Sequence, residues 1–181
     1  MKNILLRTAE IEDADELGSL HVRTWQETYT GLLPNEFLEK TTINSRVEMW
    51  QRVLSQMETL GVVSVVVAQG AEGIIGFASS SKQRNIDLVE MGYLGEIGAI
   101  YVLNSFQNKG IGSALMREMA RALSERKLNS ASLWVLEDNS PALRFYEYHG
   151  AKPLNLSKPF TDGSSIREMA YGWRDLAPLI Y

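Results

Sequence analysis

The segment from Gln107 to Gly112 constrains this chain more than any other. It reads Gln-Asn-Lys-Gly-Ile-Gly, follows an apolar run at 97–103, and precedes an amphipathic helical pattern that starts at Ser113. Two glycines one residue apart let the backbone turn tightly, so that successive N–H groups point into one small space. The first turn of the following helix adds unpaired N–H groups and the positive end of the helix dipole. The pattern therefore predicts a strand, a turn that binds an anion such as a diphosphate, and a helix.

Composition limits the class of protein. The chain has 181 residues, 45% hydrophobic and 22% charged, which is typical of a single globular domain spanning 1–181. It has no cysteine, which excludes disulfides and a cysteine nucleophile and fits a cytoplasmic location. His21 is expected on a helix face and His149 as a helix-end cation, too far apart for a metal site. We expect no membrane contact, because the apolar runs are short, and no nucleic-acid partner, because the net charge is −4 without a long basic run.

The spacing of apolar residues predicts an α+β fold. Strands are predicted at 4–8, 62–68, 74–80, 96–103, 132–136, 154–160 and 166–173. Helices are predicted from about Asp13 to Tyr29 and at 45–59, 113–127 and 140–148, with a short helical turn at 34–40 and a polar connection at 81–94. The architecture that follows is a mixed, mostly antiparallel sheet of about seven strands flanked by helices.

Local signals mark the ends of several elements. Asp13 followed by Glu16 has the spacing of a capping box. Asn139-Ser140-Pro141 is a small polar cap with proline near the first helical position, and Gly150 ends that helix. Asp162-Gly163 predicts the turn of a closing hairpin.

Three kinds of nucleotide-binding turn compete for Gln107–Gly112. A Walker-type loop needs Gly-x-x-x-x-Gly-Lys-Ser/Thr, and the segment has neither that spacing nor that lysine. A dinucleotide-binding turn fits the two glycines, with the acidic pair at 137–138 after the next strand as ribose ligands. Against it, the third glycine position is Leu115, and the preceding strand ends near Leu103, several residues before the first glycine.

The third alternative comes from a resemblance. The motif Gln-x-x-Gly-x-Gly and the order of the elements resemble the GNAT superfamily of N-acetyltransferases over nearly the whole chain. Residues 9–14 resemble its N-terminal region, 97–123 its acetyl-CoA signature, and 133–146 the strand and helix that complete its site. The resemblance implies acetyl-CoA as cosubstrate, no metal, and a sheet whose central strands splay apart.

The resemblance also implies which residues hold the cosubstrate. Main-chain N–H groups of the turn and the first helical turn would bind the diphosphate; these residues are Gln107, Asn108, Lys109, Gly110, Ile111, Gly112 and Ser113. The backbone of Ile100, Tyr101 and Val102 would pair with the pantetheine arm and polarise the acetyl carbonyl, with Gly98 as the place of distortion. Asn139 would bond the cosubstrate, cap its helix, or do both.

Two residues are candidates for proton transfer. The resemblance places Tyr146 beside the CoA sulfur, and a phenol with a reference pKa near ~10 can protonate a leaving thiolate; the alternative is packing against Phe145. Glu96 is the candidate base, and strand alternation predicts that it shares a face with Ile100 and Val102. The alternatives are that Glu96 is a solvated residue, that the nearby Glu90 is the base, and that the amine loses its proton to solvent.

The acceptor side is less defined. Trp25 and Tyr29 lie at helical spacing, which fits a packed core, whereas the resemblance makes them walls of an acceptor pocket. We expect an N-acetyltransferase that acts by direct attack in a ternary complex on a primary amine of a small molecule or peptide, and the lack of cysteine agrees with direct attack. The rival hypothesis is a non-catalytic sensor that binds acyl-CoA. Families of this kind often form homodimers, and the sequence leaves the oligomeric state open.

Overall fold

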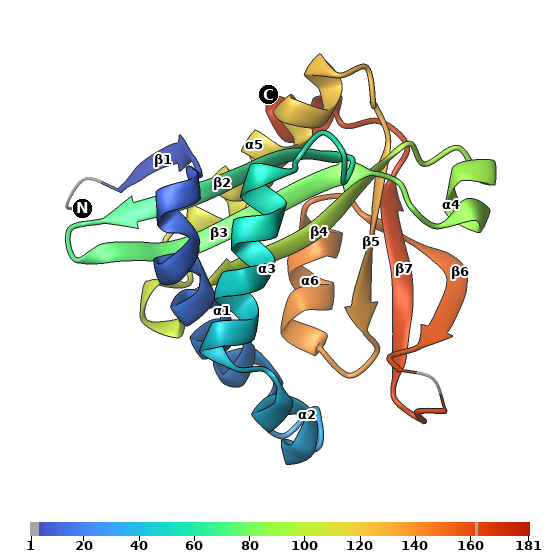
Figure 1. Ribbon diagram of the computed structural model, residues 1–181. Helices are drawn as coiled ribbons and strands as arrows, with labels where there is room; N and C mark the ends of the chain where they lie inside the picture. The colour runs from blue at the N-terminus through green and yellow to red at the C-terminus, as the bar shows by residue number, and fades with distance from the viewer. Residues whose placement is uncertain (1–3, 162) are drawn as a thin grey trace.

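The computed structural model describes residues 4–161 and 163–181 as one seven-stranded sheet with helices on both faces (Figure 1). The strands are β1 (Leu5–Thr8), β2 (Val62–Gly70), β3 (Gly73–Lys82), β4 (Gly95–Val102), β5 (Ala131–Leu136), β6 (Lys152–Pro159) and β7 (Arg167–Trp173). The order in the sheet is β1-β2-β3-β4-β5-β7-β6, and every pair is antiparallel except β4–β5. The fold class predicted from the sequence is confirmed.

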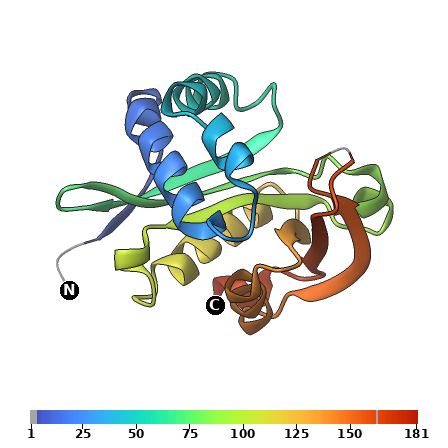
Figure 2. The ribbon, with the colours of Figure 1, turned by 90° about the horizontal axis from the view of Figure 1, so that it is seen from below.

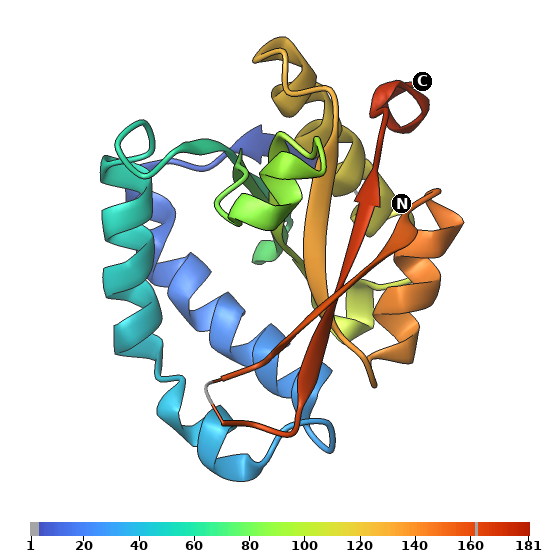
Figure 3. The same ribbon diagram turned by 90° about the vertical axis from the view of Figure 1, so that its right-hand side faces the viewer.

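The helices form two layers. They are α1 (Ala14–Tyr29), α2 (Asn35–Lys40), α3 (Ile43–Ser55), α4 (Ile86–Glu90), α5 (Ile111–Glu125), α6 (Ser140–Tyr148) and α7 (Ala177–Ile180), with 3-10 turns η1 (Ile11–Asp13) and η2 (Asn104–Phe106). Figures 2 and 3 show α1 and α3 on one face of the sheet and α5 and α6 on the other. Fully buried side chains line both interfaces, with Leu17 and Phe77 on the first and Leu115 and Met119 on the second. In the described part of the chain, no helix is long and apolar enough to cross a bilayer.

The sheet opens between β4 and β5. These parallel strands pair only at Gly95 with Ala131 and Glu96 with Ser132, and beyond that point they part. On its other edge, β4 stays paired with β3 as far as Val102, with an irregularity at Gly98. On the edge that faces β5, the backbone N–H and C=O groups of β4 beyond Glu96 therefore have no hydrogen-bond partner on a neighbouring strand. The splay expected from the sequence is present.

The start of α1 differs from the prediction. The reciprocal capping box joins Glu10 and Asp13 around η1, and Arg7 holds both carboxylate oxygens of Asp13 at 2.7 Å. Glu16 instead accepts a hydrogen bond from the backbone N–H of Ile74. The predicted Asp13–Glu16 box is wrong, because Arg7 on β1 bonds the carboxylate of Asp13 and Ile74 on β3 bonds that of Glu16.

Two short helices were not predicted. The connection at 81–94 contains α4, whose N-terminus is capped where Asn85 Oδ1 accepts from the N–H of Leu88 at 3.0 Å. The chain ends on the single turn of α7. Elements of four or five residues are too short for a hydrophobic period to show in the sequence. The closing hairpin of β6 and β7 is confirmed; of its predicted turn, Asp162 lies outside the described residues.

Candidate active site

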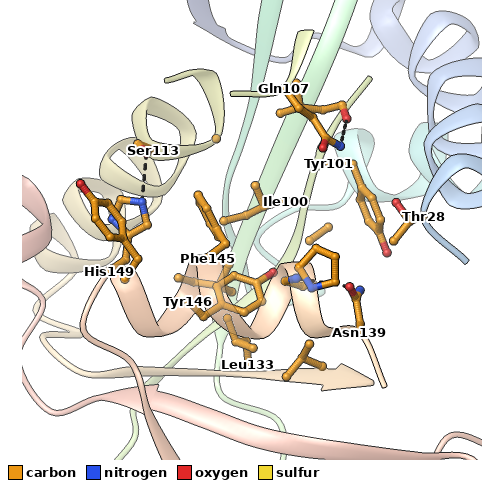
Figure 4. A pocket seen from close by; sticks show the side chains of 18 of the residues that line it. Thr28, Ile100, Tyr101, Gln107, Ser113, Leu133, Asn139, Phe145, Tyr146 and His149 are labelled. Atoms are coloured by element: carbon orange, nitrogen blue, oxygen red, sulfur yellow. Dashed lines mark hydrogen bonds between the residues drawn. The ribbon is translucent and has the colours of Figure 1, made fainter. Parts of the chain in front are cut away.

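A cavity of about 420 Å³ lies where β4 and β5 part (Figure 4). Its floor is the free edge of β4, residues 97–102, and the facing part of β5, residues 133–135. The turn before α5 closes one end, and the first residues and inner side of α6 form a wall. Thr28 and Tyr29, at the end of α1, border the other end. The cavity therefore joins the glycine turn to the splayed sheet.

The glycine turn has the geometry of an anion-binding loop. Asn108 and Gly110 have positive φ, 58° and 80°, and Gly110 is the N-cap of α5. Within the described residues, no backbone or side-chain acceptor bonds the N–H groups from Asn108 to Ser113; the first helical bond runs from Ala114 to Gly110. A left-handed backbone suits glycine at 110, and a Cβ at Gly112 would stand 3.3 Å from the ring of Phe145. These donors fit a diphosphate, as the sequence predicted.

Several side chains around the turn help to hold it in shape. The amide of Gln107 donates to the carbonyl of Val102 and to Asn104 Oδ1, both at 3.0 Å. Lys109 donates to the carbonyl of Ser105 at 2.7 Å and lies over the ring of Phe106. Ile111 is buried in the core. Lys109 and Ile111 are thus absent from the cavity wall, and only their main chain is available to a ligand.

Tyr146 projects from α6 into the cavity (Figure 4). Its ring packs edge-on against Phe145 and Trp173, and among the described residues its hydroxyl has no hydrogen-bond partner. Burial raises the pKa of Tyr146, so the phenol keeps its proton at neutral pH. Asn139 also borders the cavity and caps α6, since its Oδ1 accepts from the N–H of Ala142 at 3.3 Å.

Glu96 does not lie among the residues that line the cavity. Its two carboxylate oxygens accept from Arg84 at 2.7 and 3.0 Å. Glu96 pairs with Ser81, whereas Tyr101 pairs with Phe77, and the irregularity at Gly98 shifts the alternation of β4 between them. Because residues opposite one another share a face, Glu96 faces the same side as Tyr101. The predicted shared face with Ile100 and Val102 is wrong.

The end of the cavity at Thr28 and Tyr29 is aromatic. Tyr29 lines the cavity, and its hydroxyl lies 2.9 Å from that of Tyr101, which lines it too. Burial raises the pKa of both phenols. Trp25 packs edge-on against Tyr29 at 4.6 Å between ring centres and lies behind the wall. Tyr101 thus contributes a side chain to the cavity in addition to the backbone predicted from the sequence.

Sequence reasoning missed a pair at the opposite end. Ser113 Oγ lies 3.0 Å from His149 Nε2, and both residues border the cavity (Figure 4). Burial, then the charge of Arg117, lowers the pKa of His149, so it is neutral at neutral pH and not the helix-end cation expected. The available signal was its spacing of four from Phe145, which puts both on one side of α6.

Comparison with known proteins decides the family. The profile of the acetyltransferase (GNAT) family matches residues 17–151. The chain belongs to this family. Its members are acetyltransferases, so the protein is an acyltransferase, and the Walker and dinucleotide alternatives no longer apply.

Individual GNAT proteins match this chain over almost its full length. The chain is 29% identical over 177 residues to an uncharacterized N-acetyltransferase of Bacillus subtilis (strain 168), YuaI, covering 97% of this chain and 96% of the relative. It is 27% identical to the spermidine N(1)-acetyltransferase of Thermoplasma acidophilum, covering 93% and 98%. The crystal structure of the PaiA N-acetyltransferase of Thermoplasma acidophilum, in complex with coenzyme A, superposes with a TM-score of 0.72 at 22% identity, covering 93% and 98%. Among the described residues of this chain, no cluster of three or more His, Cys, Asp or Glu side chains could hold a metal ion.

Proposed function

We propose that this GNAT protein transfers the acetyl group of acetyl-CoA to a primary amine by direct attack within a ternary complex. One observation carries the proposal: a single cavity brings together the free N–H groups of the turn, the free edge of β4 and the hydroxyl of Tyr146. The turn would bind the diphosphate, and the edge of β4 would bind the pantetheine arm as an added strand.

The proposed reaction makes two demands that this cavity can meet. As the amine nitrogen bonds to the acetyl carbon, negative charge grows on the carbonyl oxygen, and backbone N–H groups on the free edge of β4 would stabilise it. As the carbon–sulfur bond breaks, Tyr146 gives its proton to the thiolate and regains one from solvent. Burial raises the pKa of Tyr146, and a CoA thiolate that leaves in the same apolar surroundings would gain proton affinity for the same reason.

The attacking amine must also lose a proton. Arg84 occupies both oxygens of Glu96, and that carboxylate lies outside the cavity wall, which leaves the predicted base without structural support. We therefore assign the proton to solvent. An α-amino group has a reference pKa near ~8 and is partly neutral at physiological pH, so it needs no strong base. A relative that is named a spermidine acetyltransferase supports an amine acceptor.

Release of free CoA from acetyl-CoA tests the proposal. A thiol-reactive dye gives no protein background, because the chain has no cysteine. We expect steady release when amino acids, polyamines or peptides are supplied. Saturable binding of acetyl-CoA without release across that panel would instead favour the acyl-CoA sensor.

Replacement of Tyr146 tests its role. We expect Tyr146→Phe to lower kcat by about 100-fold or more, the usual contribution of a general acid, with little change in acetyl-CoA affinity. Tyr181→Phe is the matched control, since Tyr181 is fully exposed. Parallel loss of affinity and turnover in Tyr146→Phe would indicate packing rather than proton transfer.

A further inference from the structure

Two side chains at the turn end of the cavity share a hydrogen bond between α5 and the end of α6. Ser113 Oγ lies 3.0 Å from His149 Nε2, and both residues line the cavity (Figure 4). Ser113 is the third residue of α5, directly after Gly112, and within the described residues its backbone N–H is one of the donors without an acceptor. Its hydroxyl therefore lies beside the N–H groups that would hold a diphosphate.

The imidazole of His149 is held in place by its surroundings. The rings of Phe145 and Tyr148 pack edge-on against it, with ring centres 4.7 and 5.2 Å away. On β7, the indole N–H of Trp173 donates to the carbonyl oxygen of His149 at 2.7 Å, which fixes the main chain. The ring of Phe145 also lies 3.3 Å from the place of a Cβ at Gly112. One aromatic ring thus packs against both the turn and the imidazole and keeps them in register.

The hydrogen bond between Ser113 and His149 can run in either direction, according to the tautomer of the imidazole. If the hydroxyl donates to Nε2, Ser113 offers only lone pairs to the cavity, which repel an anion. If Nε2 carries the proton and donates to Ser113 Oγ, the hydroxyl proton is free to donate to a ligand. An anion at the turn selects the second arrangement. His149 Nδ1, which has no partner among the described residues, is then the atom open to protonation.

The charges around His149 favour an anion as well. Burial and then the charge of Arg117, one turn after Ser113 on α5, lower the pKa of His149. In the described part of the chain, Arg117 forms no ion pair. On α6, Glu147 accepts from the hydroxyl of Tyr171 on β7 at 3.1 Å. A diphosphate at the turn would bring negative charge close to the imidazole and raise its pKa again.

We propose that the side chains of Ser113 and His149 recognise the coenzyme diphosphate as a pair. His149 Nε2–H donates to Ser113 Oγ, the Ser113 hydroxyl donates to a diphosphate oxygen, and His149 Nδ1 takes up a proton from solvent as the coenzyme binds. This inference rests on the proposed function, because it needs a diphosphate at the turn. Ser113 touches the coenzyme, whereas His149 acts through Ser113 and is a positioning residue. Coenzyme binding is then linked to pH.

A double-mutant cycle at pH 8 tests the hydrogen-bonded pair. The ligand is dephospho-CoA, which keeps the diphosphate and lacks the 3′-phosphate, whose own titration would interfere; calorimetry measures its Kd. We expect Ser113→Ala to raise Kd by about 10-fold or more, the loss of a hydrogen bond to a charged group, and His149→Leu to raise it by about 2- to 10-fold. Because His149 acts through Ser113, the double variant should bind no more weakly than Ser113→Ala.

The matched control for the cycle is Ser124→Ala, which removes a serine of α5 that does not line the cavity. Its Kd should equal that of the wild type. Unchanged Kd in folded Ser113→Ala, or losses that add in the double variant, would overturn the inference.

Proton uptake tests the role of His149 separately. The chain has two histidines and no cysteine, and burial holds the pKa of His21 at about 3, so His149 is the histidine that titrates near neutral pH. Calorimetry at pH 6.5 in buffers of different ionisation enthalpy should show proton uptake when dephospho-CoA binds. Since the pKa is lower in the free protein than in the complex, affinity should rise by about 3-fold or more from pH 8 to pH 6. His149→Gln keeps a donor without a titration and should bind without this uptake; equal uptake in both proteins would contradict the proposal.

This inference and the proposed function fail in different ways. Turnover of acetyl-CoA, together with the same dephospho-CoA affinity in the wild type, Ser113→Ala and His149→Leu, would overturn the inference and leave the transferase activity intact. The expected binding pattern without release of CoA to any amine would support the diphosphate contact while the transferase activity fails. No binding of dephospho-CoA to the wild type at millimolar concentration would overturn both.

Discussion

At the scale of single residues, burial decides which groups carry charge. Burial among aromatic rings, with the charge of Arg46, lowers the pKa of His21 to about 3. In the unfolded chain the same imidazole takes up a proton near ~6.5. Between these two values the unfolded state binds one proton more than the native state, so the free energy of unfolding falls as the pH is lowered.

This difference predicts a pH dependence that belongs to His21. From pH 7 to pH 5 its contribution to the free energy of unfolding should decrease by roughly 2 kcal/mol. Urea unfolding at several pH values, for the wild type and for His21→Leu, measures it. We expect the variant to lose about 2 kcal/mol less than the wild type over that interval. Parallel pH profiles for the two proteins would show that His21 titrates normally in the native state.

At the scale of elements, the contact between α1 and α3 depends on one glycine. A Cβ at Gly18 would stand 2.5 Å from Val47 Cγ2 and 2.8 Å from its backbone nitrogen. Gly18→Ala should therefore force the two helices apart and lower the free energy of unfolding by about 1–3 kcal/mol, although alanine is the better helix former. Thermal unfolding measures the loss, with Ser19→Ala on the exposed side of α1 as the control. Unchanged or higher stability in Gly18→Ala would mean that α3 can move away from the added methyl group without loss of stability.

The same contact has a functional consequence. α1 carries His21, Trp25 and Tyr29, and α3 carries Arg46 and Trp50. Moving one helix against the other would displace Tyr29, which lines the cavity, relative to the sheet. For this reason we expect Gly18→Ala to raise KM for the acceptor more than KM for acetyl-CoA, whose proposed contacts come from β4, α5 and α6.

At the scale of the whole molecule, the opening of the sheet leaves β4 half paired. Amides at 97–102 on its free edge should exchange with deuterium faster than those of β3, which has a partner on both sides. Coenzyme A should slow exchange over 97–102 and at the turn, by up to about 100-fold at 100 times Kd. Hydrogen exchange with mass spectrometry measures this, with β6 at the far edge as internal control. Uniform protection, or none at β4, would contradict binding of the cosubstrate in the splay.

A feature could be predicted from the sequence when it depends on residues that are neighbours in the chain, and could not when it depends on distant ones. The turn at 107–112 and the cap at Asn139 were predictable, because backbone conformation and capping depend on a few adjacent residues. The surroundings of Glu96 were not, because its face depends on an irregularity in β4 and its carboxylate is bonded by Arg84, twelve positions earlier in the chain. Likewise, the spacing of Asp13 and Glu16 gave no sign that Arg7 and Ile74 would take their carboxylates.

The sequence by itself therefore determined the order of the strands and of the longer helices, the glycine turn and the family resemblance, since these follow from short-range periodicity and from motifs. Only the tertiary structure decided which side chains share a space. Ser113 on α5 meets His149 at the end of α6, and Arg46 on α3 lies over the ring of Trp25 on α1. Such contacts depend on strand register and helix packing, which bring together residues that lie far apart in the sequence.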